Sequence, residues 1–203
     1  MWRTPKTSNT RRPLMSFQGF ELYQARPEDF WLAMLWTALD PCHAGKVEPE
    51  QWIDWQPGVE SYLWRDKQGW LFFSRLNRRV MCFGGQSNPR MVVEVRMQFA
   101  PYVEAPPPPN YPLNTPARIE AAKPINPDRT MRGLILGTEW LCRSLAQTDV
   151  SALCFESESP SLIRFCRKRM GFKRDGKSLI KWLVEPDGTE GSRKAQEKSV
   201  NGS

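Results

Sequence analysis

The sequence predicts an α+β fold, in which a central mixed and twisted sheet is flanked by helices. Residues 59–99 are rich in β-prone side chains that alternate between apolar and polar, which predicts an antiparallel meander. Residues 128–185 then follow the order helix, short apolar strand, helix and strand, which is βαβ-like. The chain has 203 residues, of which 40% are hydrophobic and 25% charged, and these proportions are typical of one globular domain.

The N-terminal part is expected to hold a flexible arm, a strand and a buried helix. Residues 1–16 are polar and basic and lack hydrophobic periodicity, so we expect a flexible basic arm there. A strand over residues 20–24, a turn at residues 26–27 and a helix from about Glu28 follow, with acidic residues in the first turn of the helix. Apolar residues cover most of this helix and predict that it is largely buried: Phe30, Trp31, Met34, Leu35, Ala38 and Leu39.

The predicted meander has four strands separated by turns. The strands are residues 59–64, 69–76, 79–85 and 91–99. The turns are residues 66–69, 77–79 and 84–89. In the last strand one face should pack and the other should meet polar surroundings. The packing face holds Met91, Val93, Val95, Met97 and Phe99, and the polar face holds Glu94, Arg96 and Gln98.

A proline-rich insertion is expected to follow the meander. Nine of the eighteen prolines lie in residues 101–127, which predicts an extended surface loop, partly polyproline II, and excludes a central strand or a helix interior. Asp128 is expected to cap the next helix, which reaches about Gln147. A single domain should therefore span residues 17–186, followed by a polar tail over residues 187–203.

The positive charge of the chain is concentrated in one segment. The formal net charge is +7, and residues 161–181 hold eight Lys or Arg residues against one acid, Asp175. On the predicted helix over residues 161–170, an apolar stripe faces inward and leaves Arg164, Arg167 and Lys168 outward. This patch would attract phosphates, but no nucleic-acid-binding motif accompanies it. A nucleic-acid-binding function therefore ranks last, and a nucleic acid partner is not expected.

The sequence indicates neither a metal site nor a membrane span. The five cysteines are widely spaced without a CxxC pair, which fits reduced thiols, and the neighbours Cys42 and His43 fit a loop better than a zinc site. No apolar run is long enough to cross a bilayer, and residues 1–14 lack the apolar run of a secretory signal. We therefore expect a soluble cytoplasmic protein without a metal or a membrane partner.

Residues 129–176 resemble a known family. They contain a glycine-bearing helix, a short strand and a second helix that ends at Gly171 and Phe172, in the stretch SPSLIRFCRKRMGF. This order is similar to the Gcn5-related N-acetyltransferase (GNAT) superfamily. The resemblance implies a GNAT-like acyl-CoA N-acyltransferase fold, with acetyl-CoA in an opening between the fourth and fifth strands. Its pyrophosphate would meet backbone N–H groups at the start of the following helix.

The resemblance implies a phosphate-binding turn around Gly133. This residue matches the first glycine of the family's turn, whereas Thr130 stands in place of the usual Gln or Arg and Ile135 in place of a second small residue. Arg129 and Arg132 would then supply positive charge to the phosphates. The alternative is that the glycine only lets the helix pack closely on the sheet.

Further residues follow from the same resemblance. Val95 and Met97 on the fourth strand, and Ser159 where the family often has Asn, are implied to contact acetyl-CoA. Cys166, or Arg167 in a second register, stands where the family has a tyrosine that protonates the departing thiolate, so Cys166 is the candidate acid. Glu94 is the candidate general base. Each of these side chains is also compatible with packing or a surface ion pair.

Three function classes follow. The first is an N-acetyltransferase, fully active or degenerate, that transfers an acetyl group from acetyl-CoA to an amine of a small molecule or a protein. The second is a non-catalytic GNAT-fold protein with a structural or regulatory role, such as a phage-encoded virion component that contacts other virion proteins. The third is a nucleic-acid-binding protein that uses residues 164–181.

Overall fold

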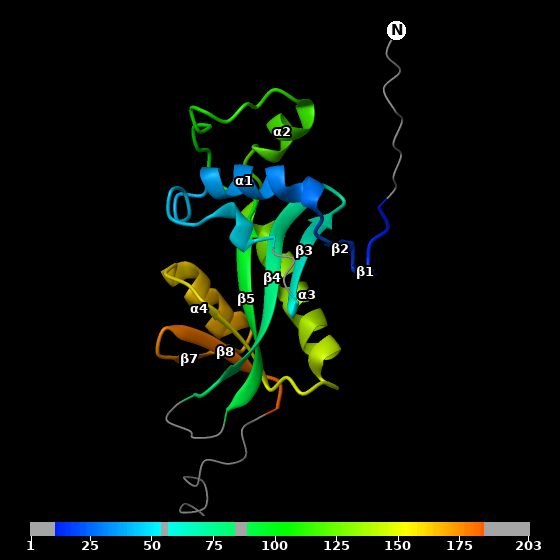
Figure 1. Ribbon diagram of the computed structural model, residues 1–203, viewed down its shortest axis with the longest axis vertical. Coiled ribbons are helices and arrows are strands. Elements are labelled where there is room, and N and C mark those ends of the chain that lie inside the picture. The colour runs from blue at the N-terminus through cyan, green and yellow to red at the C-terminus, as the bar shows by residue number, and fades with distance from the viewer. Residues whose placement is uncertain (1–10, 54–56, 84–88, 185–203) are drawn as a thin grey trace, which may run out of the picture. The chain divides into compact units, whose positions relative to one another are not determined.

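The computed structural model of the protein describes residues 11–53, 57–83 and 89–184 (Figure 1). Its strands are β1 (Met15–Phe17), β2 (Phe20–Gln24), β3 (Val59–Asp66), β4 (Gly69–Met81), β5 (Arg90–Phe99), β6 (Ala152–Glu156), β7 (Lys173–Asp175) and β8 (Ser178–Trp182). Its helices are α1 (Phe30–Leu39), α2 (Pro116–Ala121), α3 (Pro127–Leu145) and α4 (Pro160–Arg169), with short 3-10 helices η1 (Pro27–Asp29) and η2 (Pro49–Gln51).

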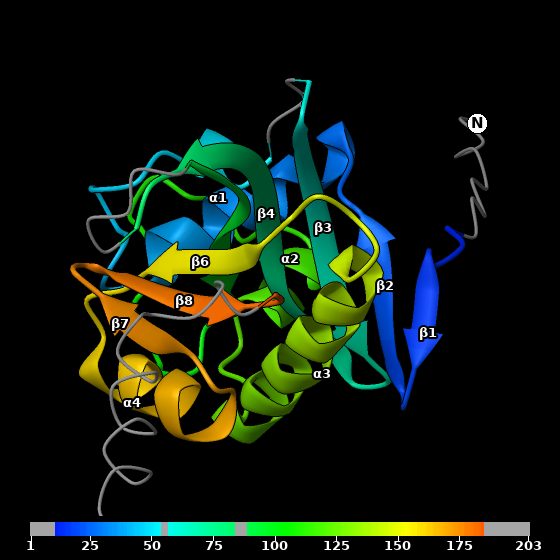
Figure 2. The ribbon, with the colours of Figure 1, turned by 90° about the horizontal axis from the view of Figure 1, so that it is seen from below.

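The strands form one mixed sheet, which confirms the predicted α+β class. Their order is β1-β2-β3-β4-β5-β6-β8-β7. β6 runs parallel to β5, with Ala152 opposite Val92, whereas β8 runs antiparallel to β6. Helices flank the sheet (Figure 2).

The chain divides into two compact units. The first is Met1–Leu76 with Arg96–Leu134, and the second is Asn77–Val95 with Ile135–Ser203. The predicted single domain over residues 17–186 stays a prediction.

Strand β4 is longer than predicted, and the expected turn at residues 77–79 is wrong. β4 continues through these residues to Met81. A tight hairpin turn needs positive φ angles, and none of the residues 77–79 adopts one. Arg79 instead pairs with Glu94 of β5. The turn at residues 66–69 is confirmed, with a φ of +134° at Gly69, whereas residues 84–88 of the third expected turn lie outside the described residues.

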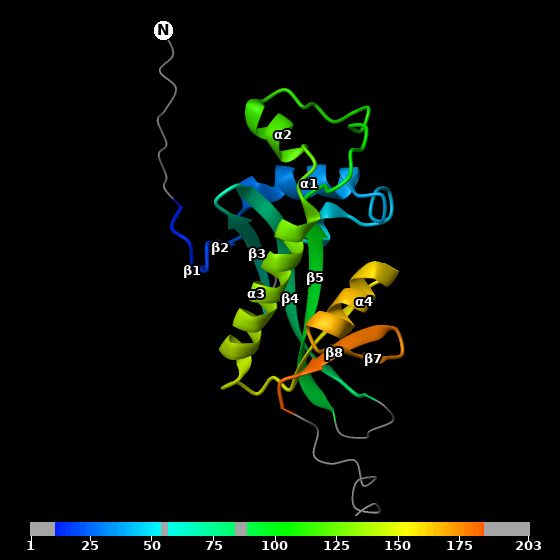
Figure 3. The same ribbon diagram turned by 180° about the vertical axis from the view of Figure 1, so that it is seen from behind.

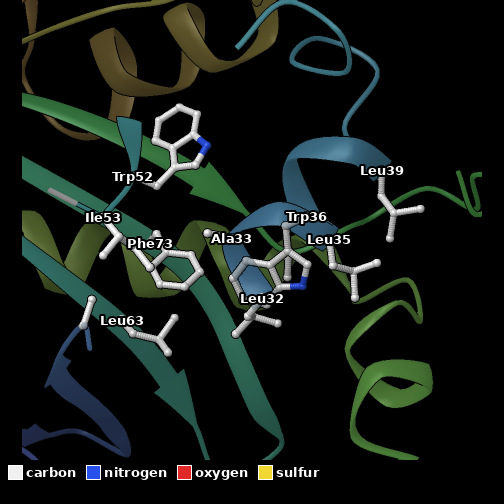
Figure 4. Packing of buried hydrophobic residues seen from close by; sticks show 11 residues of the cluster. Leu32, Ala33, Leu35, Trp36, Leu39, Trp52, Ile53, Leu63 and Phe73 are labelled. Atoms are coloured by element: carbon white, nitrogen blue, oxygen red, sulfur yellow. The ribbon is translucent and has the colours of Figure 1, made fainter. Parts of the chain in front are cut away.

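The core of the first unit forms around α1 (Figure 4). Leu35 and Trp36 of this helix are almost fully buried, and the Trp36 ring packs edge-on against Phe73 of β4 with 5.5 Å between ring centroids. Met34 is exposed, so the predicted burial of α1 holds for most of the helix but not for this residue. The core therefore joins α1 to the central strand β4.

The proline-rich segment is not only an extended loop, because it contains α2. Thr115 caps this helix by accepting a hydrogen bond from the Arg118 N–H, and Pro116 occupies its first position. Proline is tolerated at that position because an N–H group there has no acceptor within the helix. The segment packs on α1, since the Trp36 indole donates to the Ala121 carbonyl at 3.0 Å, and α2 lies beside α1 in Figures 1 and 3.

The predicted N-terminal arm is shorter than 16 residues. Residues 1–10 lie outside the described residues, but Arg11 forms an ion pair with Asp29 at 2.8 Å. Met15–Phe17 then form β1, which pairs antiparallel with β2. These contacts could not be predicted from the composition of the arm, because their partners lie further along the chain.

The second unit contains the predicted strand, helix and strand at its C-terminal end. β6 is almost entirely buried. Helix α4 ends at Arg169 with Met170 as its C-cap, and Gly171, which has a φ of +72°, follows the cap. β7 was not predicted; it pairs with β8 across a turn in which Gly176 has a φ of +56°. In Figures 2 and 3 α4 lies beside this β7–β8 hairpin.

Helix α3 begins at Pro127, two residues earlier than a cap at Asp128 predicts, and Asp128 is not its cap. The Asn126 side-chain oxygen accepts a hydrogen bond from the Asp128 N–H at 2.9 Å. Asn126 can take this role because an Asx oxygen reaches the second helical N–H, whereas Asp128 lies inside the first turn.

We expect Gly133→Ala to lower the free energy of unfolding by about 1 kcal/mol. A Cβ at this position would lie 3.1 Å from Leu71 and 3.2 Å from Phe20, and both side chains are buried. Alanine favours the helix, but a methyl group forced into this packed contact costs more. Urea unfolding measures the change. Ser144→Ala, on the exposed side of α3, is the control and should change stability little; a more stable Gly133→Ala protein would contradict the tight packing.

Candidate functional site

The first turn of α3 is the place where the resemblance puts the pyrophosphate of acetyl-CoA. Pro127, at the first position, has no N–H donor. The Asp128 N–H is bonded to the Asn126 side chain, and the Arg129 N–H to the Asn126 carbonyl at 3.1 Å. The exposed Asp128 carboxylate adds negative charge at the same turn. The three leading positions of α3 therefore offer no free N–H donor to an anion, and Asp128 adds a negative charge beside them.

Gly133 lies further along α3 and faces the sheet. Its nearest neighbours are Leu71 and Phe72 of β4 and Phe20 of β2, so the bare backbone is used for helix-to-sheet packing. Thr130 is only 1% exposed, and its hydroxyl has no hydrogen-bond partner among the described residues. A ligand cannot reach that hydroxyl because neighbouring atoms cover it. These positions favour the packing interpretation over phosphate binding.

The two arginines of the predicted turn also have partners in the first unit. Arg129 forms a two-pronged ion pair with Asp66, with distances of 2.9 Å from Nε and 2.5 Å from Nη2 to the two carboxylate oxygens. Burial opposes ionisation of Asp66, but the hydrogen bonds from Arg129 outweigh it and lower the pKa of this carboxyl group. The Arg132 guanidinium lies over the Phe20 ring, 5.7 Å from its centroid.

The residues present therefore do not fit the pyrophosphate of acetyl-CoA at the start of α3. Val95 and Met97 are half-buried on β5, and Ile135 is half-buried in α3. Ser159 caps α4, since its hydroxyl accepts from the Leu162 N–H at 3.4 Å. Contacts of Val95, Met97 and Ser159 with a cofactor stay predictions.

The candidate base, Glu94, has an ion-pair partner in the second unit. Its carboxylate lies 2.6 Å from Arg79 on β4. The Glu94 hydrogen bond is the main reason that the pKa of Arg79 is raised. The structure thus favours the ion-pair interpretation of Glu94, and its role as a base stays a prediction.

The candidate acid, Cys166, is buried in α4. Only 1% of the residue is exposed, and burial raises the pKa of its thiol to about 12. An ordinary thiol has a pKa near 8.5. Cys166 is therefore a much weaker acid than an ordinary thiol and is poorly suited to protonate a departing thiolate. Arg167, the alternative in the second register, is exposed on the other side of α4. The position of Cys166 is therefore that of a packing residue.

A polar cluster in the first unit was missed at the level of sequence. His43 Nδ1 lies 2.7 Å from Gln98 Oε1 and 3.2 Å from Asp40 Oδ2, and Gln98 also donates to Asp40 at 3.0 Å. Gln98 is fully buried, although the period of β5 assigned it to the polar face. The loop after α1 covers it, and its polar surroundings are these two side chains. The sequence offered one signal for this cluster: the single histidine of the chain, His43, lies three residues after Asp40.

The cluster links two titratable groups. Burial opposes ionisation of Asp40, but hydrogen bonds from His43, from the Cys42 N–H and from Gln98 outweigh it and lower the pKa of Asp40. The hydrogen bond to Asp40 is the largest effect on His43 and raises its pKa, against the opposing effect of burial. The His43 ring also lies against Trp52, with 5.2 Å between ring centroids. The cluster is thus a pH-sensitive link between the loop and β5.

The described residues hold neither a metal-binding cluster nor a membrane-spanning helix. Over residues 11–53, 57–83 and 89–184, no group of three or more His, Cys, Asp or Glu side chains could hold a metal ion. In that same part of the chain, no helix combines the length and the apolar character that crossing a bilayer requires.

Comparison with known proteins gives likeness of structure alone. No protein-family model matches the sequence, and no curated protein matches it. An aminoglycoside N(6′)-acetyltransferase from Legionella pneumophila is 11% identical, over 84% of this chain and 95% of that chain, with a TM-score of 0.48. An N-acetyltransferase from Staphylococcus aureus Mu50 is 8% identical, over 81% and 97%, with a TM-score of 0.43.

Other similar structures include an acetyltransferase of the GNAT family from Streptococcus pneumoniae and a toxin bound to acetyl-CoA. The GNAT enzyme is 10% identical, over 80% of this chain and 98% of that chain, with a TM-score of 0.39. The toxin is a mutant of AtaT, bound also to the C-terminus of the antitoxin AtaR; it is 10% identical, over 62% and 68%, with a TM-score of 0.37. Likeness at this level concerns the backbone and carries no argument about chemistry.

Thiol labelling of the native protein should modify two cysteines rapidly. Cys42 and Cys82 are exposed, whereas Cys154 and Cys166 are buried with thiol pKa values raised to about 11 and about 12. Cys142 is half-buried and should react more slowly. A chromogenic disulfide reagent at pH 8 measures the number of thiols that react. All five thiols should react in denaturant. Cys166→Ala should leave the rapid count unchanged, and rapid loss of one equivalent in this variant would contradict the burial of Cys166.

The stability contribution of His43 should decrease as the pH rises. Because its pKa is higher in the folded protein, the contribution is fully present below the unfolded pKa of about 6.5 and is lost as the pH passes through the folded value. The opposite holds for Asp40, whose contribution is lost as the pH falls through its lowered folded pKa. His43→Asn should therefore cost about 1 kcal/mol more at pH 5.5 than at pH 8.5 in urea unfolding. Lys67→Ala, at an exposed position, should show no such dependence; equal costs of His43→Asn at both pH values would contradict the link.

Proposed function

We propose that this protein is a non-catalytic binding protein built on a GNAT-like fold, with a structural or regulatory role. The first turn of α3 carries the proposal. Its three leading positions offer no free N–H donor, and Asp128 places a negative charge where a pyrophosphate would bind. An acetyl-CoA-dependent enzyme needs that anion site because the pyrophosphate anchors the cofactor.

The candidate catalytic groups support the same proposal. Glu94 forms an ion pair with Arg79, and burial raises the pKa of the Cys166 thiol. Glu94 thus has an ion-pair role and Cys166 a packing role, and the proposal assigns neither of them to acetyl transfer. Such a protein would bind a macromolecule and not an amine substrate. The binding would take place in the cytoplasm or in a virion.

We expect acetyl-CoA not to bind saturably up to about 1 mM, which exceeds the usual Michaelis constants of enzymes. Calorimetric titration at 0.3 M NaCl measures binding, and the high salt suppresses attraction between the cofactor and exposed basic side chains. A thermal melt with 1 mM acetyl-CoA should show an unchanged Tm, because only a bound ligand stabilises the folded state.

The matched control separates specific from charge-driven binding. A triple variant, Arg164→Glu, Arg167→Glu and Lys168→Glu, changes exposed basic residues of α4 and leaves α3 intact. Binding that disappears in this variant would be attraction to basic side chains and would leave the proposal standing. One-to-one binding that survives both the triple variant and 0.3 M NaCl would overturn it.

A further inference from the structure

The outward face of α4 is a basic surface with few opposing charges. We call Arg164, Arg167 and Lys168 the α4 basic face; all three are exposed and lie one helical turn or less apart. Arg169 at the end of α4, and Arg174 and Lys177 of the β7–β8 hairpin, are also exposed. This hairpin lies beside α4 in Figure 3. The segment that holds them carries a net charge equal to that of the whole chain, so the remainder of the chain is close to neutral.

The described part of the chain supplies no carboxylate partner to these charges. Among the residues that the structure describes, no ion pair includes any of the three side chains of the α4 basic face. The nearest acidic residues in sequence are Glu158, which precedes the helix, and Asp175 in β7. Basic residues elsewhere behave differently, since Arg11, Arg79 and Arg129 each have a carboxylate partner. The α4 basic face therefore keeps its full charge for an external anion.

The surface lacks the apolar groups that a protein partner would need. The exposed large hydrophobic residues of the described chain all lie outside α4 and β7: Leu14, Met34, Val80, Tyr102, Val103, Ile119 and Val184. Protein interfaces have an apolar or aromatic centre, and single-stranded nucleic acids bind through aromatic stacking, so neither partner fits a surface of Arg and Lys alone. A duplex fits, because its backbone presents about one negative charge per 1.7 Å of axis and needs no stacking.

We infer that the α4 basic face binds the phosphate backbone of a nucleic acid duplex without sequence specificity. Arg164 and Arg167 can each offer two N–H groups to one phosphate, and Lys168 adds a point charge one turn from Arg164. Four residues of helix span about 6 Å, so several phosphates lie within reach of the three side chains. Nucleic acid binding, which ranked last from the sequence, is thus favoured by the exposed and unpaired charges of α4, whether or not acetyl-CoA binds.

Fluorescence anisotropy of a labelled 20-base-pair DNA duplex tests the inference with the full chain. We expect a dissociation constant of about 1 to 100 µM at 0.1 M NaCl, the range of non-specific binding. Three phosphate contacts give a slope of about −2.7 for log affinity against log salt, which is about a 40-fold loss between 50 and 200 mM. The triple variant with Arg164→Glu, Arg167→Glu and Lys168→Glu should bind at least tenfold more weakly.

A second triple variant, Arg12→Glu, Lys46→Glu and Lys67→Glu, changes the net charge equally at exposed positions of the first unit. Its affinity should stay within about threefold of the wild type. Circular dichroism verifies that each variant is folded. If the glutamate variant of α4 is unfolded, the glutamine variant at the same three positions replaces it and should reduce the salt slope.

Three outcomes would overturn the inference. The first is no saturable binding of the duplex below 100 µM at 50 mM NaCl. The second is an equal loss of affinity in both triple variants, because this would mean that only net charge matters. The third is equal or tighter binding of a single strand of the same length or of a polyglutamate peptide, since then the partner would not be a duplex.

Discussion

The contact between the first turns of α3 and the sheet of the first unit is the constraint on which the candidate site depends. Two features make it close: the absence of a side chain at Gly133, and the two-pronged pair between Arg129 and Asp66. The pair is mostly shielded from water, so the loss of either partner would leave a buried charge without compensation. Helix and sheet are thus held together by the same residues that a phosphate site would have to use.

This use of Gly133 and Arg129 explains how a sequence can resemble a cofactor-binding turn without fitting the cofactor. A glycine allows either a ligand or another backbone to come close, and only its neighbours decide which one does. Here the neighbours are Phe20, Leu71 and Phe72. The same ambiguity applies to a carboxylate and a thiol, since Glu94 has a guanidinium partner and Cys166 has apolar surroundings. Residue type alone did not determine the chemistry of any of these positions.

Two other polar features of the chain lie away from the first turn of α3. In the first unit, Asp40, His43 and Gln98 hold the loop after α1 against β5 and respond to pH. In the second unit, α4 carries an exposed basic face while its other side packs through the buried Cys166 and Met170. A fold of this kind can serve as a binding scaffold, because its sheet and helices stay packed while exposed charges contact a partner.

The sequence by itself determined the α+β class, most helices and strands, and the outward direction of the α4 arginines. These features follow from periodicity and composition, which are local properties of the chain. Only the tertiary structure decided that β4 runs through residues 77–79, that Asn126 caps α3, that Gly133 faces the sheet and that Gln98 is buried beside His43. Each of these depends on residues that are distant in sequence or on a choice between neighbouring caps, and local patterns do not specify which contact has the lower free energy.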